Sequence, residues 1–373
     1  MHIERIDLFH VGLPLKQPAQ IAFRRQEVLQ TVVVRMAGGG AVGWGEAGPG
    51  NAPLTSGEWA GGVLAVLRDW LAPAVAGATI DSPEDLQQRL AQFRGNLCAK
   101  AALDTAWWDL QARLEGRPLH DLLDGHRAAV EVGPTFDRMP SGDEFLAGIG
   151  HALQAGFARV KLIFRPGWDV EMLRAVRREF PAQTFHIDCQ AALGLEHMEM
   201  LCRLDDFCLA MIEQPLPADD LVGHAMVQET VRTPIGLDEG VTTPAQAEMA
   251  LDLKSGQWVS LTPGKVGGLT PARAIHDACQ AGGVSCWVGA MPQSAVGARF
   301  ELALAAKANC RYPADFFPSD EVLARDLAEP LRPARDPADG VLRVPLWTTP
   351  GIGVEPDPAC LEQSTLQQAT LRG

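Results

Sequence analysis

The chain has 373 residues, of which 47% are hydrophobic and 21% charged, so we expect a globular protein with a large core and two domains. Its net charge of −14 argues against nucleic acid as a partner, because phosphates need a basic patch. No apolar run approaches the ~20 residues of a membrane span, and "MHIERIDLFHV" lacks the features of a signal peptide. Eight cysteines without an export signal favour reduced thiols, which predicts a cytoplasmic protein without a membrane partner.

The first part of the chain does not follow a βα rhythm. Residues 1–12, 28–37 and 40–47 predict an antiparallel meander, with "AGGG" as the turn between the last two strands. Three helices are predicted next, from "SGEWAGGVLAVLRDWLAPAV", from the segment that Ser82 caps, and from "AKAALDTAWWDLQARLEG". We therefore assign residues 1–125 to an α+β domain.

Strands and helices alternate from about residue 131 onward. The predicted strands are 131–136, 158–164, 185–188, 210–213, 235–238, 258–262 and 285–289. Strict alternation predicts a parallel sheet, and seven or eight units predict a (β/α) barrel with its site at the carboxyl ends of the strands. A doubly wound sheet is the alternative, but it would need a glycine-rich phosphate loop, and "VGPTFDRMPSG" is not one. The barrel is assigned to residues 126–325, and residues 326–373 are predicted to pack back on the first domain.

Three of the predicted barrel strands end on a carboxylate. Asp188, Glu213 and Asp238 follow one another at intervals of 25 residues, about the length of one βα unit. The three side chains should therefore lie at one level on successive strands, where they repel one another unless a cation lies between them. Carboxylate ligands suit Mg²⁺ or Mn²⁺. Each acid alone would more simply be a solvated strand end or a helix N-cap, but the equal spacing favours a metal site.

Several motifs resemble those of the enolase superfamily and its muconate-lactonizing subgroup, within it the o-succinylbenzoate synthases and N-acylamino acid racemases. They are "GWGEA", "KLIFRPGWD", "IEQPL", "TPIGLDE", "TPGKVGGLTPA" and "PGIGVEPD", and they extend over nearly the whole chain. The resemblance implies a (β/α)7β modified TIM barrel with an α+β capping domain, and it implies that the three carboxylates bind Mg²⁺. It also implies removal of a proton next to the carboxylate of a small molecule, through an enediolate stabilised by the metal. A homo-oligomer is expected.

The sequence departs from the family where the proton carriers should be. The family has Lys-x-Lys on the second barrel strand, and here Lys161 is kept while Ile163 replaces the catalytic lysine. The opposing Lys-Pro-Gly of the family is Thr262-Pro263-Gly264, and a family glutamate corresponds to Gln293. A positioned general base contributes ~10²–10⁴-fold to rate. Two-base racemisation should therefore be absent, and the one-base elimination of the succinylbenzoate type should be strongly slowed.

Few residues remain as substitutes for the missing lysines. Lys161 is the predicted catalytic residue, either as a base or, as we favour, in a purely electrostatic role. His186 is interpreted as a packed interior histidine and Lys265 as structural. Substrate specificity in the family comes from the capping loops, here 13–25 and 48–58. The predicted substrate-binding residues are Lys16, Arg24, Ile163, Thr262 and Gln293. For Lys16 and Arg24 the equal alternative is a surface charge.

Two functions from different classes follow from this pattern. One is a metal-dependent lyase, isomerase or cyclase with non-standard acid/base residues. The other is a metal-binding homologue that has lost catalysis and acts as a ligand-binding or partner protein. All three predicted metal ligands remain, which favours the enzyme.

Overall fold

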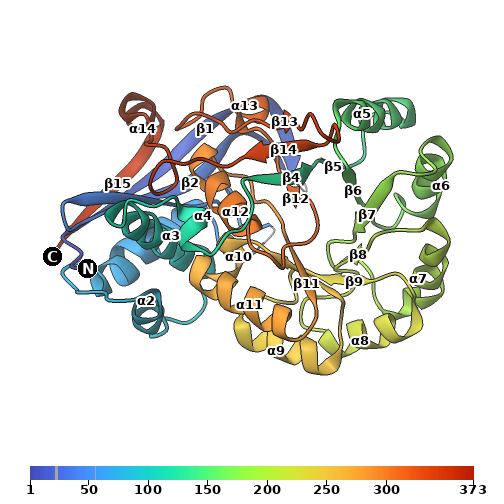
Figure 1. Cartoon of the computed structure of the whole chain (residues 1–373), viewed down its shortest axis with the longest axis horizontal. Helices are drawn as coiled ribbons and strands as arrows, with labels where there is room; N and C mark the ends of the chain where they lie inside the picture. Colours follow the sequence, from blue (N-terminus) through green and yellow to red (C-terminus); the bar gives the residue numbers. More distant parts are fainter. Residues whose placement is uncertain (22–23, 55) are drawn as a thin grey trace.

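The computed structural model describes residues 1–21, 24–54 and 56–373, with the backbone alone for residues 20, 21 and 24. Its first part is an antiparallel sheet in the strand order β15-β1-β2-β3 (Figure 1). The strands are β1 (Arg5–Ile21), β2 (Arg24–Gly38), β3 (Ala41–Ala47) and, from the far end of the chain, β15 (Thr365–Arg372). The three N-terminal strands match the predicted meander, and the turn between β2 and β3 uses positive φ angles at Gly39 and Gly40.

Helices cover one face of this sheet. They are α1 (Ala60–Val66), a π-helical turn (Leu67–Leu71), a 3-10 turn (Ala72–Ala74), α2 (Pro83–Leu90), α3 (Leu97–Leu114) and α4 (Leu119–Leu122). The single helix predicted over 56–75 is thus broken, because Pro73 has no N–H to continue the α-helical pattern. Helix α3 packs so closely on β3 that a Cβ at Gly43 or Gly45 would lie within 2.3 Å of the helix backbone. Glycine is therefore required at both positions.

The second part is a barrel of parallel strands, as predicted. Seven strands follow the order β11-β10-β9-β8-β7-β6-β5, and β12 completes the ring by contacting β11 and pairing in parallel with β4. The strands are β4 (Ala129–Gly133), β5 (Thr135–Phe136), β6 (Arg159–Ile163), β7 (Thr184–Asp188), β8 (Ile212–Glu213), β9 (Ile235–Leu237), β10 (Trp258–Leu261), β11 (Ser285–Val288) and β12 (Ala314–Asp315). All of β6 is buried, which explains its nearly continuous apolar sequence.

Helices connect successive barrel strands, and Figure 1 shows α5 to α9 along the outer side of the sheet. They are α5 (Gly142–Ala155), α6 (Val170–Glu179), α7 (Met198–Leu204), α8 (Leu221–Thr230), α9 (Pro244–Leu253), α10 (Pro263–Val266), α11 (Leu269–Ala281) and α12 (Ala295–Ala305), with 3-10 turns at Leu195–His197 and Asp205–Phe207. This alternation brings the carboxyl ends of the strands to one face of the barrel.

The C-terminal segment is shared between the two parts of the molecule. After α13 (Ser319–Val322), it contains β13 (Ala334–Arg335), β14 (Leu342–Pro345), α14 (Pro358–Ser364) and β15. Strand β14 pairs with β4 beside the barrel, whereas β15 pairs with β1 in the capping sheet. Across the described residues, none of the helices has the length and apolar character needed to cross a bilayer.

Candidate active site

The three carboxylates lie on neighbouring strands at the carboxyl end of the barrel. Asp188 is the last residue of β7 and is in register with Glu213, the last residue of β8. Glu213 is in register with Gly236 of β9, and Asp238 follows that strand directly. The interval of 25 residues therefore corresponds to one βα unit, and the strand ends place the three acids around one point of the barrel rim.

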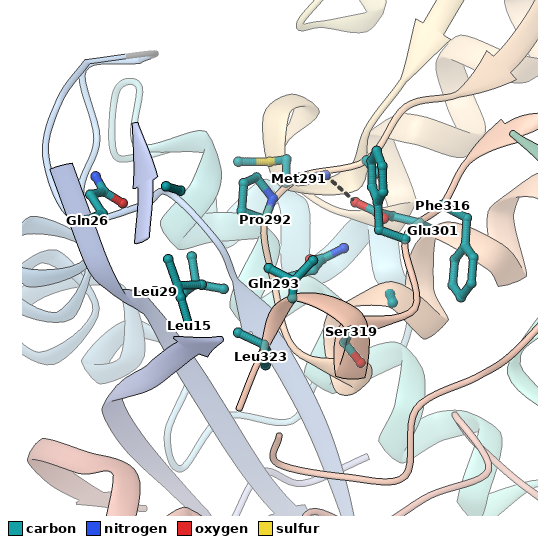
Figure 2. A pocket seen from close by; sticks show the side chains of 15 residues that line it. Leu15, Gln26, Leu29, Met291, Pro292, Gln293, Glu301, Phe316, Ser319 and Leu323 are labelled. Carbon is teal, nitrogen blue, oxygen red and sulfur yellow. Dashed lines mark hydrogen bonds between the residues drawn. The ribbon is translucent and has the colours of Figure 1, made fainter. Parts of the chain in front are cut away.

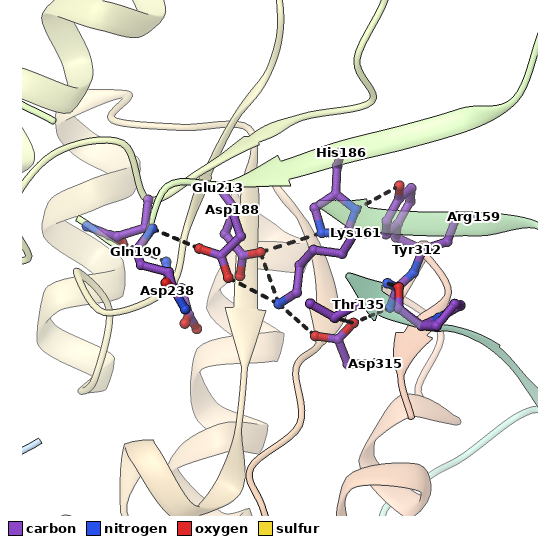
Figure 3. A network of polar contacts seen from close by, with 12 residues as sticks. Thr135, Arg159, Lys161, His186, Asp188, Gln190, Glu213, Asp238, Tyr312 and Asp315 are labelled. Carbon is purple, nitrogen blue, oxygen red and sulfur yellow. Dashed lines mark hydrogen bonds and ion pairs between the residues drawn. The ribbon is translucent and has the colours of Figure 1, made fainter. Parts of the chain in front are cut away.

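Lys161 lies among the buried carboxylates, as Figure 3 shows. Its Nζ is 3.3 Å from Asp188 Oδ2 and 3.5 Å from Glu213 Oε2. It lies 2.7 Å from Oδ2 of a further carboxylate, Asp315 at the end of β12. Burial alone would lower the pKa of Lys161, but the three carboxylates raise it well above the ordinary value. The side chain is therefore a fixed cation.

Asp315 is a site residue that the sequence analysis missed. Its Oδ1 accepts a hydrogen bond of 2.6 Å from Arg159 Nη2 and one of 3.3 Å from the Thr135 hydroxyl. Burial would raise the pKa of Asp315, but Lys161 and Arg159 hold it well below its ordinary value. The same signal that identified the other acids, a carboxylate at the end of a short strand, was present in "YPADFF".

Glu213 is the most deeply buried of the predicted ligands, with 1% of its surface exposed. Burial raises its pKa well above the ordinary value, and the charge of Asp188 raises it further. The neighbouring imidazole does not neutralise this acid. His186 is fully buried, which lowers its pKa well below the ordinary value, and its Nδ1 forms a 3.1 Å hydrogen bond with the Tyr312 hydroxyl. His186 is therefore neutral, as expected of a packed interior histidine.

Asp238 is oriented by a different set of contacts. Its carboxylate forms an ion pair with Lys265 of α10, and its backbone N–H donates to Gln214 Oε1 at 2.8 Å. In Figure 3 its side chain lies apart from those of Asp188 and Glu213. Lys265, interpreted from sequence as structural, thus belongs to the site. It supplies a second cation on the side of the barrel opposite Lys161.

Three carboxylates are the donors that Mg²⁺ takes in proteins, so the residues fit this metal in kind. In the geometry of the described residues, however, no three acidic, histidine or cysteine side chains converge closely enough to hold an ion. The reason is that Lys161 holds Asp188 and Glu213 while Lys265 holds Asp238. Binding of a metal would require these carboxylates to turn from the two lysines toward one another.

The two positions at which the resemblance leads us to expect lysines border this site. Ile163 is the last residue of β6, is 6% exposed, and is in register with Asp188. Thr262 follows β10 and is 2% exposed. Neither side chain can take up a proton near neutral pH.

A cavity of about 330 Å³ lies between the capping domain and the barrel rim (Figure 2). Leu15 and Leu29 line it from the capping sheet, and Met291 and Phe316 line it from the barrel. Phe316 follows Asp315 directly, and Met291 Sδ lies 2.7 Å from the point where a Cβ of Gly264 would be. Two residues of the cavity wall thus neighbour residues of the barrel rim, whereas the carboxylates of the site and Lys161 are not among the residues that line it.

The structure separates the five predicted substrate-binding residues. Gln293 lines the cavity, while Ile163 and Thr262 lie at the barrel rim. Lys16 is exposed on β1 and is not among the residues that line the cavity. The backbone of Arg24 begins β2, and its side chain lies outside the described part of the chain.

Comparison with known proteins gives matches over almost the whole chain. Residues 4–124 match the mandelate racemase / muconate lactonizing enzyme N-terminal domain, and residues 145–360 match the enolase C-terminal domain-like family. The chain is 36% identical to an "o-succinylbenzoate synthase" of Geobacillus kaustophilus, over 98% of this chain and 96% of that protein. It is also 36% identical to an "N-succinylamino acid racemase" of Thermus thermophilus, over 99% and 98% of the two chains. A crystal structure of an enolase-superfamily member from Listeria innocua superposes with a TM-score of 0.94 at 28% identity, covering 100% of this chain and 99% of the other.

Proposed function

Because this chain belongs to the enolase superfamily, we propose that it is a divalent-metal-dependent lyase, isomerase or cyclase whose acid/base residues differ from those of its relatives. Its substrate is a small carboxylate, from which a proton is removed at the carbon next to the carboxylate group. One observation carries the proposal. Asp188 and Glu213 are buried side by side at the barrel rim with Asp238 on the next strand, and Lys161, which Asp315 also engages, and Lys265 do not compensate all of these buried carboxylates, so a further cation would stabilise them.

Members of this superfamily use Mg²⁺, and here Asp188, Glu213 and Asp238 would hold it. When bound, Mg²⁺ supplies a Lewis acid that holds the substrate carboxylate and stabilises negative charge developing on it. Lys161 provides a second fixed positive charge on the β6 side of the site. Its 2.7 Å ion pair with Asp315, which is not a proposed ligand, keeps it in place whichever ligands turn toward the metal.

Proton transfer is the step in which this chain differs from its relatives. By resemblance, Ile163 and Thr262 occupy the positions of the two family lysines. Racemisation by the two-base route is therefore not its reaction. Because neither of these residues accepts a proton and Lys161 stays charged, the proton would pass to a water molecule at the barrel rim.

The cavity between the domains would receive the rest of the substrate. Its wall joins the capping sheet to the rim residues that follow β11 and β12, so a substrate anchored at the carboxylates would extend into it. Of the residues predicted to bind substrate, Gln293 is the one that lines this cavity.

The test is exchange of the α-proton in deuterium oxide, followed by NMR for a panel of small carboxylic acids with and without Mg²⁺. We expect Mg²⁺-dependent exchange on at least one acid, and Lys161→Met should abolish it while the matched surface change Lys254→Met should not. Exchange that persists after chelation would contradict the proposal. Mg²⁺-dependent binding of acids without exchange on any of them would favour the ligand-binding homologue instead.

A further inference from the structure

The cavity beside the site has an almost entirely apolar wall. Leucine, methionine, phenylalanine and alanine side chains from both domains form most of it. Figure 2 shows where the exceptions lie, with Glu301 and Gln293 near the barrel side. Among the described side chains that line the cavity, none is basic.

Glu301 lies on α12 and is 6% exposed. Its Oε1 accepts a 3.0 Å hydrogen bond from the backbone N–H of Met291. Burial raises the pKa of Glu301 well above its ordinary value, and the negative charges of Asp315 and Glu46 raise it further. Arg299, the basic residue of the same helix, donates its hydrogen bonds to the backbone carbonyls of Ile352 and Glu329 rather than to Glu301. The polar end of the cavity is thus acidic and has no compensating cation in the described structure.

Gln293 supplies a second polar group of the wall, and Gln26 and Ser319 are the remaining polar residues that line it. The Nε2 of Gln293 is buried without a hydrogen bond of ordinary geometry, but the amide lies close enough to the Glu301 carboxyl to oppose the rise in the pKa of that acid. A buried donor that is paired this weakly recovers only part of the roughly 1–3 kcal/mol that a good acceptor would return. A ligand that brings a neutral acceptor to this point would supply the rest.

We propose that this cavity binds an uncharged, mainly apolar substituent with one hydrogen-bond acceptor, and that Glu301 is the specificity-determining residue that excludes a second carboxylate. The inference rests on the proposed function, in which the first carboxylate of the ligand is held at the barrel rim. It sets this chain apart from relatives named for succinyl substrates, whose distal group carries a charge.

The physical reason is the cost of desolvating an anion. A carboxylate moved from water into an apolar cavity loses hydration worth several kcal/mol unless a cation or a full set of donors replaces it. Glu301 offers at most one donor, and only when it holds a proton beside a second acid. An amide or ketone oxygen loses much less hydration, and the Gln293 amide can donate to it.

A matched pair of ligands tests this directly. N-butanoyl-L-phenylalanine and N-succinyl-L-phenylalanine have the same acyl length and differ in the distal carboxylate. Dissociation constants would be measured by isothermal titration calorimetry on the full chain with saturating Mg²⁺. We expect the butanoyl ligand to bind at least about tenfold more tightly, a difference of about 1.4 kcal/mol.

Two variants assign the preference to one residue. Glu301→Gln keeps the size of the side chain and should reduce the ratio of the two dissociation constants at least about threefold, and Glu301→Met should act in the same direction if the first variant folds poorly. The control, Glu229→Gln on the exposed side of α8, should leave the ratio unchanged. Circular dichroism would verify that each variant is folded.

The outcomes separate this inference from the proposed function. Equal or tighter binding of the succinyl ligand, no binding of either ligand, or an unchanged ratio in both folded Glu301 variants would overturn the inference. If chelation of Mg²⁺ leaves both affinities and their ratio unaltered, the specificity of the cavity stands while the metal-anchored function fails. If both ligands bind equally well and only with Mg²⁺, the metal-anchored function stands and the proposed specificity of the cavity fails.

Discussion

Lys161 and Asp315 form the centre of a buried charge network whose geometry bears on one question that the sequence left open. Lys161 could have been a base or an electrostatic group. Its ion pairs with Asp315, Asp188 and Glu213 favour the second role, because three acids stabilise the charged amine. Asp315 also neutralises Arg159, so one carboxylate compensates two buried cations.

Removing that carboxylate should be costly. We expect Asp315→Asn to lower the free energy of unfolding by ~3–5 kcal/mol, because breaking a buried ion pair leaves uncompensated charge in the interior. Urea unfolding followed by tryptophan fluorescence would measure the change, with the exposed Asp206→Asn as the control. A loss below about 1 kcal/mol, the size typical of surface pairs, would show that Arg159 and Lys161 find other partners.

In contrast to Asp315→Asn, a substitution of Glu213 should not lower the stability of the fold. Burial and the neighbouring Asp188 already disfavour its charge, so Glu213→Gln should leave the fold intact. Affinity for Mg²⁺ should nevertheless fall by at least about tenfold, the lower end of what even outer-shell substitutions cost a metal site. Calorimetric titration with Mg²⁺ would measure it beside Glu229→Gln, and unchanged affinity would remove Glu213 from the ligand set.

Helix α3 shows how an element fixes the domains in place. Its buried Asp104 accepts hydrogen bonds from the Thr270 hydroxyl at 2.6 Å and from Gln87 Nε2 at 2.8 Å, which joins the helix to α11 of the barrel. Asp109 of the same helix accepts from the backbone N–H of Trp44 at 2.8 Å and of Ile352 at 2.7 Å. Burial raises the pKa of each acid to about 6. The helix therefore connects four segments, which are α2, α11, β3 and the chain around Ile352, through two acids whose pKa is raised by burial.

The contribution of Asp104 to stability should depend on pH, because folding raises the pKa of this acid. Between its ordinary pKa and about 6, Asp104 binds more protons in the folded than in the unfolded chain, so its contribution to stability falls as pH rises through that window. From about pH 5 to about pH 7, the wild type should lose about 1 kcal/mol relative to Asp104→Asn. Urea unfolding of both proteins at the two pH values measures this difference. A constant difference would mean that the hydrogen bonds keep Asp104 ionised throughout.

At the scale of the whole molecule, the sequence predicted the features that local periodicity indicates. Alternating strands and helices indicated the barrel, and the equal spacing of Asp188, Glu213 and Asp238 placed them on neighbouring strands. Features that depend on closure of the ring were missed. Asp315 meets Lys161 only because β12 returns beside β4. Lys265 and Asp238 follow the neighbouring strands β10 and β9, but the sequence did not indicate that their side chains would pair. The cavity depends on both domains, so no single stretch of sequence indicated Glu301.

The proposed reaction needs the barrel residues for proton transfer and both domains for the substrate cavity, and a pair of substitutions in the barrel tests this. The wild type should show negligible α-proton exchange with N-acylamino acids, because Ile163 and Thr262 offer no base. The double variant Ile163→Lys with Thr262→Lys should restore exchange, since the proposed metal ligands and Lys161 are already in place and neighbouring cations lower the pKa of a new buried lysine toward neutrality. Each lysine is longer than the residue it replaces, so overpacking should cost ~1–3 kcal/mol of stability.

The rate of exchange in the double variant should also depend on how well the acyl group of the substrate suits the cavity. It should be faster with N-butanoyl than with N-succinyl amino acids, because Glu301 remains, and NMR in deuterium oxide would measure both rates. The matched control, Thr262→Lys alone, restores one face and should exchange only one enantiomer of each pair. A folded double variant that binds Mg²⁺ and the butanoyl ligand without exchange would show that the two lysines are not sufficient. The capping domain would then hold the α-carbon out of their reach, and a different reaction, or binding alone, would be the better account.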